Sequence, residues 1–291
     1  MKNHIITREK NNKLVLLGTK GGPAVVDNKT LPTSNYLMID GLSIVIDCGL
    51  GVTKRLKEEN IDIKKLDLIF ITHLHSDHLI ELGPLIHTIW ASGSKKKINI
   101  YGPNGIEDYI NNFLQSMSVD INTRISDEGR QDINKIIKIN LLKNGLIFNK
   151  NIKISALKVK HPPIKEAFAI KFVGSKKIVF SGDTKFFLPL INFSKESDFL
   201  IHEAYLKKSL DKIVQKTQLG KKLKNHLTRS HTPLEKVIQI ARKAKIKTLI
   251  INHLIPPQTH KNAWEDELSK YQSKNLGFKI LIGYDKLKVI F

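Results

Sequence analysis

The 291-residue chain contains one cysteine, Cys48, so an intrachain disulfide is excluded and nothing in the composition indicates an oxidising compartment. It lacks any uninterrupted apolar stretch of roughly 18 residues, the minimum for a membrane-spanning helix. The polar segment 1–13 and the short apolar run at 14–17 do not resemble a secretory signal. We therefore expect a cytoplasmic protein without a membrane partner.

Acidic residues are scarce, because 27 Asp and Glu stand against 48 Lys and Arg, a formal net charge of +21. Such an excess attracts polyanions, nucleic acid above all. The basic residues are 42 Lys and only 6 Arg, however, and Arg is the side chain that phosphate recognition favours. A composition biased towards Lys, Asn and Ile explains the charge equally well, so the charge alone leaves the function open.

The hydrophobic share of 41% is that of an ordinary globular protein, and no repeat, low-complexity linker or composition break divides the chain. We expect residues 1–291 to form a single α/β domain, because short β-branched runs alternate with helical patterns. Strands are predicted at 13–17, 35–39, 42–46, 66–72, 97–101, 135–141, 151–160, 168–173, 177–180, 199–202, 248–252 and 279–281, with a final pair around 286–291. Helices are predicted at 53–59, 77–91, 105–116, 204–218, 233–244 and 262–271.

The sharpest motif is THLHSDH at residues 72–78, between an apolar strand and an amphipathic helix. His73 and His75 point the same way along an extended segment, and Asp77 and His78 follow on the first helical turn. Four ligand-type side chains thus converge within six residues. A catalytic zinc takes three protein ligands plus water, so the motif predicts two metal ions and further ligands downstream.

Three downstream residues have a suitable setting, since His161, Asp183 and His253 each stand at the end of an apolar strand. One such residue alone is more often a capping or core polar group than a ligand. The recurrence of the same placement, together with the first motif, favours metal binding.

These residues resemble the metallo-β-lactamase-fold hydrolases over nearly the whole chain, including the loop LGTKGG at 17–22 and IDCG at 46–49. The resemblance implies an α/β fold (α+β in some schemes): a four-layer αβ/βα sandwich of two mixed sheets with outer helices. It implies one zinc held by His73, His75 and His161, a second held by Asp77, His78 and His253, and Asp183 bridging both. Asp47 would support the site without being a ligand. His and Asp ligands also admit Mn²⁺, Fe²⁺ or Co²⁺.

In such a site, a hydroxide held between the two ions attacks the substrate while the metals neutralise charge in the transition state. His231 resembles a family position suited to a general acid, and Glu203 would orient it. The alternative reading of this pair is a helix cap and a strand-end polar pair. We expect the catalytic residues to be Asp77, His231 and Glu203. Surface or structural roles are expected for His4, His87, His226 and His260.

Within the family, Cys48 lies beside Asp47 and not near the second metal, which argues against a β-lactamase. HPP at 161–163 differs from the corresponding stretch of glyoxalase II-like thioesterases. Ribonuclease Z shares the opening loop and SGDT, but its long tRNA-grasping arm does not fit the interval of 22 residues from His161 to Asp183. HTPLE at 231–235 looks more like the arylsulfatase-like or phosphodiesterase-like branch.

The leading hypothesis is therefore a dinuclear zinc hydrolase of an anionic ester, a phosphodiester or aryl sulfate. The alternatives are a ribonuclease Z-like tRNA 3′-processing endoribonuclease and, in another class, a non-catalytic polyanion-binding protein on a hydrolase fold. The expected partner is an anionic small-molecule ester or a nucleic-acid phosphodiester, and a homodimer is left open. The Lys-rich segment 207–229 is either a basic flap that attracts anionic substrates or a solvated helix face.

Overall fold

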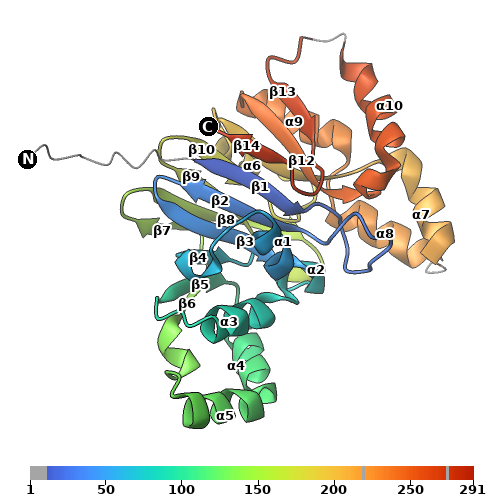
Figure 1. The fold of residues 1–291 in the computed structure, drawn as a ribbon. Helices are drawn as coiled ribbons and strands as arrows, with labels where there is room; N and C mark the ends of the chain where they lie inside the picture. Colours follow the sequence, from blue (N-terminus) through green and yellow to red (C-terminus); the bar gives the residue numbers. More distant parts are fainter. Residues whose placement is uncertain (1–11, 218–219, 273–274) are drawn as a thin grey trace, which may run out of the picture.

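Two seven-stranded mixed sheets lie face to face in the computed structural model, which describes residues 12–217, 220–272 and 275–291 (Figure 1). The first sheet has the spatial order β14 (Lys288–Ile290), β1 (Lys13–Gly18), β2 (Ser34–Ile39), β3 (Leu42–Cys48), β4 (Leu68–Phe70), β5 (Ile98–Gly102), β6 (Ile137–Leu141). The second has the order β13 (Lys279–Ile282), β12 (Thr248–Ile255), β11 (Phe199–Tyr205), β10 (Lys177–Phe180), β9 (Ile164–Val173), β8 (Lys153–His161), β7 (Gly145–Asn149).

Most helices cover the outer sides of this pair of sheets (Figure 1), whereas the seventh and eighth pack on each other and on Tyr205 and Ile255. They are α1 (Val52–Glu58), α2 (Ser76–Leu79), α3 (Leu82–Ala91), α4 (Ile106–Ser116), α5 (Ser118–Glu128), α6 (Pro189–Phe193), α7 (Leu210–Thr217), α8 (Gly220–Ser230), α9 (Leu234–Ala244) and α10 (Lys261–Gln272). Single 3₁₀ turns lie at Ile63–Lys65, Ile133–Ile136, Lys207–Ser209 and Gln258–His260. Among the helices described, none is long and apolar enough to cross a membrane.

Alternation along the strands builds the layers. In β1, Leu14 and Leu16 pack into the core between the sheets, whereas Val15 and Leu17 pack into the cluster beneath α1 and α3. Because successive side chains of a strand point to opposite faces, a run that is apolar throughout is buried on both sides. The predicted two-sheet sandwich with outer helices is therefore confirmed. That residues 1–291 form a single domain stays a prediction.

The predicted elements differ from the structure where tertiary packing overrides local pattern. The helix expected at 204–218 was wrong in its first part, because Ala204 and Tyr205 continue β11 beside β12. The helix expected at 77–91 is divided into α2 and α3, and the Glu81 carboxylate at the division accepts the backbone N–H of Gly51 and of Thr53. Helix α5 escaped prediction because only Ile121 is buried and Val119 is exposed, so its apolar residues do not follow a helical stripe.

Parallel strands direct the ligands to one edge. In the first sheet β3, β4 and β5 are parallel, and in the second β10, β11 and β12 are parallel. Ligands of α/β sheets bind outside the carboxyl ends of such strands. The predicted ligand segments that follow β4 and β10 leave the sheets at these ends, where the two sheets bring them together.

Candidate metal centre

The segment 72–78 is held in place from the adjacent strand. Asp47, in β3, accepts the Thr72 backbone N–H at 2.8 Å with Oδ1 and the Thr72 hydroxyl at 3.0 Å with Oδ2. The same Oδ2 accepts the Nδ1–H of His78 at 2.8 Å. Asp47 therefore ties both ends of the motif, in line with the supporting role that the resemblance implied. Its backbone φ of 63° is unusual for a residue other than glycine, as often occurs at functional sites.

Three imidazoles form the first cluster. His75 Nδ1 lies 3.0 Å from His73 Nε2 and 3.0 Å from His161 Nε2. Ligand nitrogens around a tetrahedral zinc are separated by about 3.3 Å, since each Zn–N bond is about 2.0–2.1 Å. His161 donates its Nδ1–H to the Ser230 carbonyl, which leaves a lone pair on the Nε2 that faces the cluster. Burial lowers the pKa of His161 to about 4, so this ring is neutral and able to bind a metal at neutral pH.

Asp77, His78 and His253 form the second cluster. Asp77 Oδ2 lies 3.3 Å from His253 Nε2 and 3.6 Å from His78 Nε2. The buried His78 Nε2 has no hydrogen-bond partner, and a lone ring nitrogen directed at carboxylates is the arrangement that a cation would satisfy. His253 is aimed by a bulge, because the pairing of β12 with β11 skips it and its φ is 43°.

Asp183 lies between the two clusters. Its Oδ2 is 3.1 Å from His253 Nε2 and 3.4 Å from His78 Nε2 in the second cluster, and 3.8 Å from both His73 Nε2 and His161 Nε2 in the first. The preceding Gly182 allows this turn, since its φ is 55° and a Cβ there would lie 2.5 Å from the Phe168 carbonyl oxygen.

The carboxylates at the centre are anionic. Burial raises the pKa of Asp183, but the nearby His253 and His78 lower it by more, so the pKa lies well below its ordinary value. Burial likewise raises the pKa of Asp77, and His78 and His253 again outweigh it. Burial lowers the pKa of His78 while the surrounding carboxylates, Asp183 first, raise it well above the usual range. The site therefore demands positive charge, which a proton or a metal ion supplies.

All seven predicted ligands are thus brought together, and the donor set fits two divalent ions. His73, His75, His161 and Asp183 each offer an atom to one group, and Asp77, His78 and His253 to another. The hydrogen bonds of His78 to Asp47 and of His161 to the Ser230 carbonyl fix the tautomers of these two rings, and the lowered pKa values of Asp77 and Asp183 favour their ionised forms. That these residues ligate metal stays a prediction, as does the identity of the metal.

His231 stands beside this centre and is held by Glu203. Its Nδ1 lies 2.8 Å from Glu203 Oε2, and Glu203 Oε1 accepts the Thr184 backbone N–H at 2.6 Å. The pKa of His231 is lowered by burial, and that of Glu203 is raised by burial and by Asp183. The pair therefore has the geometry expected of an oriented imidazole, with Nε2 left for another partner.

The loop LGTKGG reaches the second cluster from the amino-terminal side. The Gly22 backbone N–H donates to Asp77 Oδ2 at 2.7 Å, and Gly21 packs directly against His253. A Cβ at Gly21 would lie 2.8 Å from His253 Cε1 and 2.7 Å from Ile255 Cγ1. Only glycine permits this approach.

We therefore expect Gly21→Ala to displace His253 and to weaken metal binding at the second cluster by about 10- to 100-fold, as losses around ligating histidines do. Titration of metal-free protein, followed by elemental analysis, measures this. Gly129→Ala is the control for a general loss of stability, because its φ of 66° strains any side chain while its added Cβ meets nothing within 4 Å and the residue follows α5, away from the ligands. Equal metal affinity in the Gly21→Ala and wild-type proteins would contradict the assignment.

A cavity of about 490 Å³ opens beside the ligands. Its floor includes His75, Asp77 and Asp183, and its far wall is apolar, with Ile213 of α7 and Leu223 and Leu227 of α8. Val26, Ile255, Pro256 and Pro257 complete that wall. The size is that of a small-molecule site.

Comparison with known proteins places the chain. The profile of the family described as Anti-Pycsar protein Apyc1 matches residues 12–263. The chain belongs to this family.

Other relatives carry the same fold. A ribonuclease Z of Mycolicibacterium gilvum is 24% identical over 283 residues, which cover 95% of each chain. The metallo-β-lactamase fold protein YhfI of Bacillus subtilis superposes with a TM-score of 0.69 at 20% identity, covering 97% of this chain and 100% of YhfI. The short form of human tRNase Z gives 0.67 at 21% identity, covering 95% and 98%. The structural matches confirm the metallo-β-lactamase fold, and the ribonuclease Z relatives agree with the predicted class, a hydrolase of ester bonds.

Two residues of this Apyc1-family site escaped the sequence analysis. His226 was expected to be a surface or structural residue, yet it is half-buried on α8 and lines the cavity, with its ring centre 6.4 Å from that of His75. Lys20 also lines the cavity. Neither has a sequence signal, because each reaches the site through tertiary contacts of a distant element.

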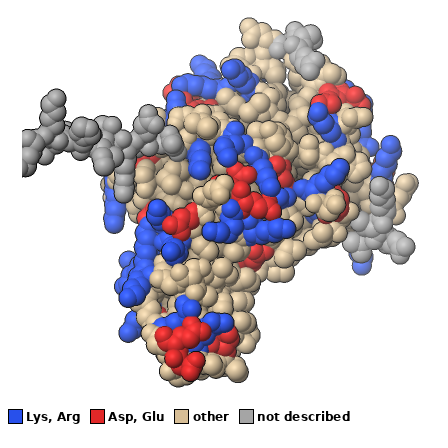
Figure 2. Space-filling model, viewed as in Figure 1, with Lys and Arg blue, Asp and Glu red and all other residues tan. Residues whose placement is uncertain are grey.

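The reading of the Lys-rich segment 207–229 as a basic flap that attracts anionic substrates stays a prediction. None of its described Lys or Arg side chains lines the cavity, and Lys207, Lys208 and Lys224 pair with carboxylates. On the face in Figure 2, Lys and Arg are spread over the body of the protein. The segment turns apolar side chains towards the site.

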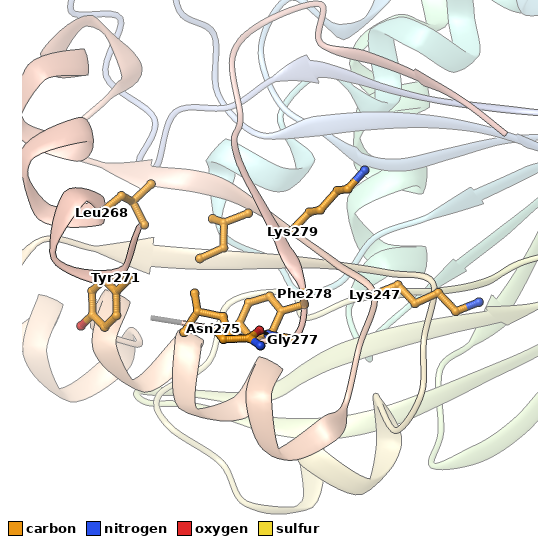
Figure 3. Close-up of a pocket in the computed structure, with 9 residues that line it drawn as sticks. Lys247, Leu268, Tyr271, Asn275, Gly277, Phe278 and Lys279 are labelled. Carbon is orange, nitrogen blue, oxygen red and sulfur yellow. Dashed lines mark hydrogen bonds between the residues drawn. The ribbon is translucent and has the colours of Figure 1, made fainter. Parts of the chain in front are cut away.

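A larger cavity of about 670 Å³ lies between α10 and β13, away from the ligands (Figure 3). Its described lining includes Tyr271, Phe278 and the stems of Lys247 and Lys279, and no His, Asp or Glu. It offers no group for metal-assisted chemistry.

Proposed function

We propose that the protein is a metal-dependent phosphodiesterase that acts on a small phosphodiester. The observation that carries this proposal is the cavity of about 490 Å³, which joins the ligand clusters to an apolar wall. A site of this size accepts one organic group next to the scissile phosphate. A nucleic-acid polymer is much larger than this cavity, so most of it would lie outside.

Each group of the site has a task in this reaction. Divalent ions at the clusters would lower the pKa of bound water and neutralise charge on the phosphoryl oxygens. Asp47 and the Ser230 carbonyl fix the orientation of His78 and His161. Glu203 holds His231 with Nε2 available to the leaving-group oxygen. Helices α7 and α8 exclude water from the organic group.

The second candidate is a ribonuclease Z-like endoribonuclease, which the names of the relatives favour. The interval from His161 to Asp183 bears on it, because β9 and β10 pair there as an antiparallel hairpin. A tRNA-grasping arm of the ribonuclease Z kind has no place between them. The short interval between His161 and Asp183 thus favours a small phosphodiester over tRNA as the substrate.

A substrate panel tests the proposal with protein reloaded with zinc or manganese. We expect turnover of bis(p-nitrophenyl) phosphate that is lost on treatment with a chelator and restored by metal, and no cleavage of precursor tRNA at its 3′ trailer. Turnover of p-nitrophenyl sulfate alone would move the assignment to an arylsulfatase. Specific cleavage of precursor tRNA would favour the second candidate.

Three finer expectations remain proposals beside this one: zinc as the native metal, a cytoplasmic location and a homodimer. Elemental analysis of protein purified without added metal tests the first, cell fractionation the second, and light scattering of the purified protein the third.

A further inference from the structure

Lys20 is a buried cation beside the metal centre. Only 3% of its surface is exposed, and it lines the cavity. Its backbone is fixed on both sides, because Lys20 N–H donates to the Leu31 carbonyl at 3.0 Å and isolated bridges join it to Pro32 and Leu254. The side chain therefore starts from a rigid base.

The Lys20 ammonium has no anionic partner among the residues described. Nζ donates to the carbonyl oxygens of Gly21, at 3.0 Å, and of Gly22. No carboxylate pairs with it, although Asp77 and Asp27 are near enough to act on it through space. An ammonium has three N–H donors, so one is left over. A buried charge without a counter-ion is costly, and an anion that binds there removes the cost.

Lys20 lies in the part of the cavity that Asp77 also lines. A Cβ at Gly22 would lie 4.0 Å from Lys20 Nζ, and the Gly22 N–H contacts the carboxylate of Asp77. Among the residues described that line the cavity, Lys20 is the one Lys or Arg. It faces a site whose own carboxylates repel anions. From this arrangement we propose that Lys20 binds an anionic oxygen of the substrate, a phosphoryl oxygen in the reaction proposed above.

This inference rests on the proposed function for the identity of the anion, but its test does not require cleavage. The probe is inorganic phosphate, measured by calorimetry on metal-loaded protein. Lys20→Gln keeps amide donors for the Gly21 and Gly22 carbonyls and removes the charge, whereas Lys20→Arg keeps the charge. Lys222→Met is the matched control, because Lys222 is exposed on α8 and does not line the cavity.

We expect Lys20→Gln to bind phosphate about 10- to 100-fold more weakly with an unchanged metal content, the loss expected for one charge-assisted hydrogen bond. Lys20→Arg is expected to recover most of the affinity, and Lys222→Met to match the wild type. With bis(p-nitrophenyl) phosphate the change is expected in KM more than in kcat. Wild-type affinity in Lys20→Gln, or a loss of metal in it, would overturn the inference, the second outcome showing that Lys20 only holds the loop.

A wild-type measurement covers the case in which Lys20→Gln does not fold. Phosphate is expected to shift the ammonium resonance of Lys20 in a lysine-selective NMR spectrum and to leave the exposed lysines of α8 unchanged. A spectrum without such a shift would overturn the inference. Phosphate binding through Lys20 without any phosphodiester turnover would instead overturn the proposed function alone.

Discussion

Replacing Asp183 by alanine is expected to lower kcat by about 10²- to 10⁴-fold and to release at least one metal ion. Loss of a group that supports one metal site commonly costs about 10- to 100-fold in affinity or activity, and Asp183 serves two clusters. Its Oδ2 lies 3.1–3.8 Å from ring nitrogens of both clusters. Steady-state kinetics and elemental analysis of the same preparation measure the two effects together.

The control for this variant is Asp127→Ala, since Asp127 is an exposed acidic residue on α5, away from the site. It removes the same charge and is expected to leave kcat and the metal content unchanged. An Asp183→Ala protein that keeps two metal ions and full activity would remove the bridging assignment.

Replacing His231 by alanine is expected to lower kcat by about 10²- to 10⁴-fold on a phosphodiester whose leaving group is an alkoxide. The reason is that an alkoxide needs a proton as it leaves. His231 has its Nδ1 occupied by Glu203, so Nε2 is the atom that would take up a proton and pass it on, and the lowered pKa of the ring makes the protonated form a stronger acid. With p-nitrophenolate as leaving group the need is small, so the effect on bis(p-nitrophenyl) phosphate is expected to be slight.

The comparison of the two leaving groups separates proton transfer from structural damage. A structural defect would lower both rates equally, and such a result would remove the general-acid role. His260→Ala is the matched control, because His260 is exposed on the turn before α10. Glu203→Gln is expected to reproduce part of the His231→Ala effect, since an amide has one acceptor oxygen whereas the two oxygens of Glu203 hold both Thr184 and His231.

The sequence predicted which candidate ligands would meet because their side chains lie at strand ends. His73, His75, Asp77 and His78 lie in one motif, and a strand followed by a ligand-type residue marks Asp183 just as clearly. The sheet topology sets the edge at which the parallel strands end. Residues that directly follow these strands therefore meet at that edge, independently of the length and sequence of the loops. The four-layer sandwich was implied by the family resemblance that these motifs carry.

The substrate side of the site was beyond the sequence. The direction of the Lys20 side chain depends on bridges to Pro32 and Leu254, which lie far away in the chain. The role of α8 depends on which face it turns to the cavity, and its lysines concealed the apolar residues Leu223 and Leu227. Local pattern reports the composition of such a helix but not its orientation.

The central claim is a centre with two metal ions that share Asp183. The most direct test is anomalous X-ray diffraction from crystals of the zinc-loaded protein, with the zinc content measured in the same sample. Two ions per chain are expected, one among His73, His75 and His161 and one among Asp77, His78 and His253, both in contact with Asp183. A single ion, or ions bound away from these residues, would contradict it.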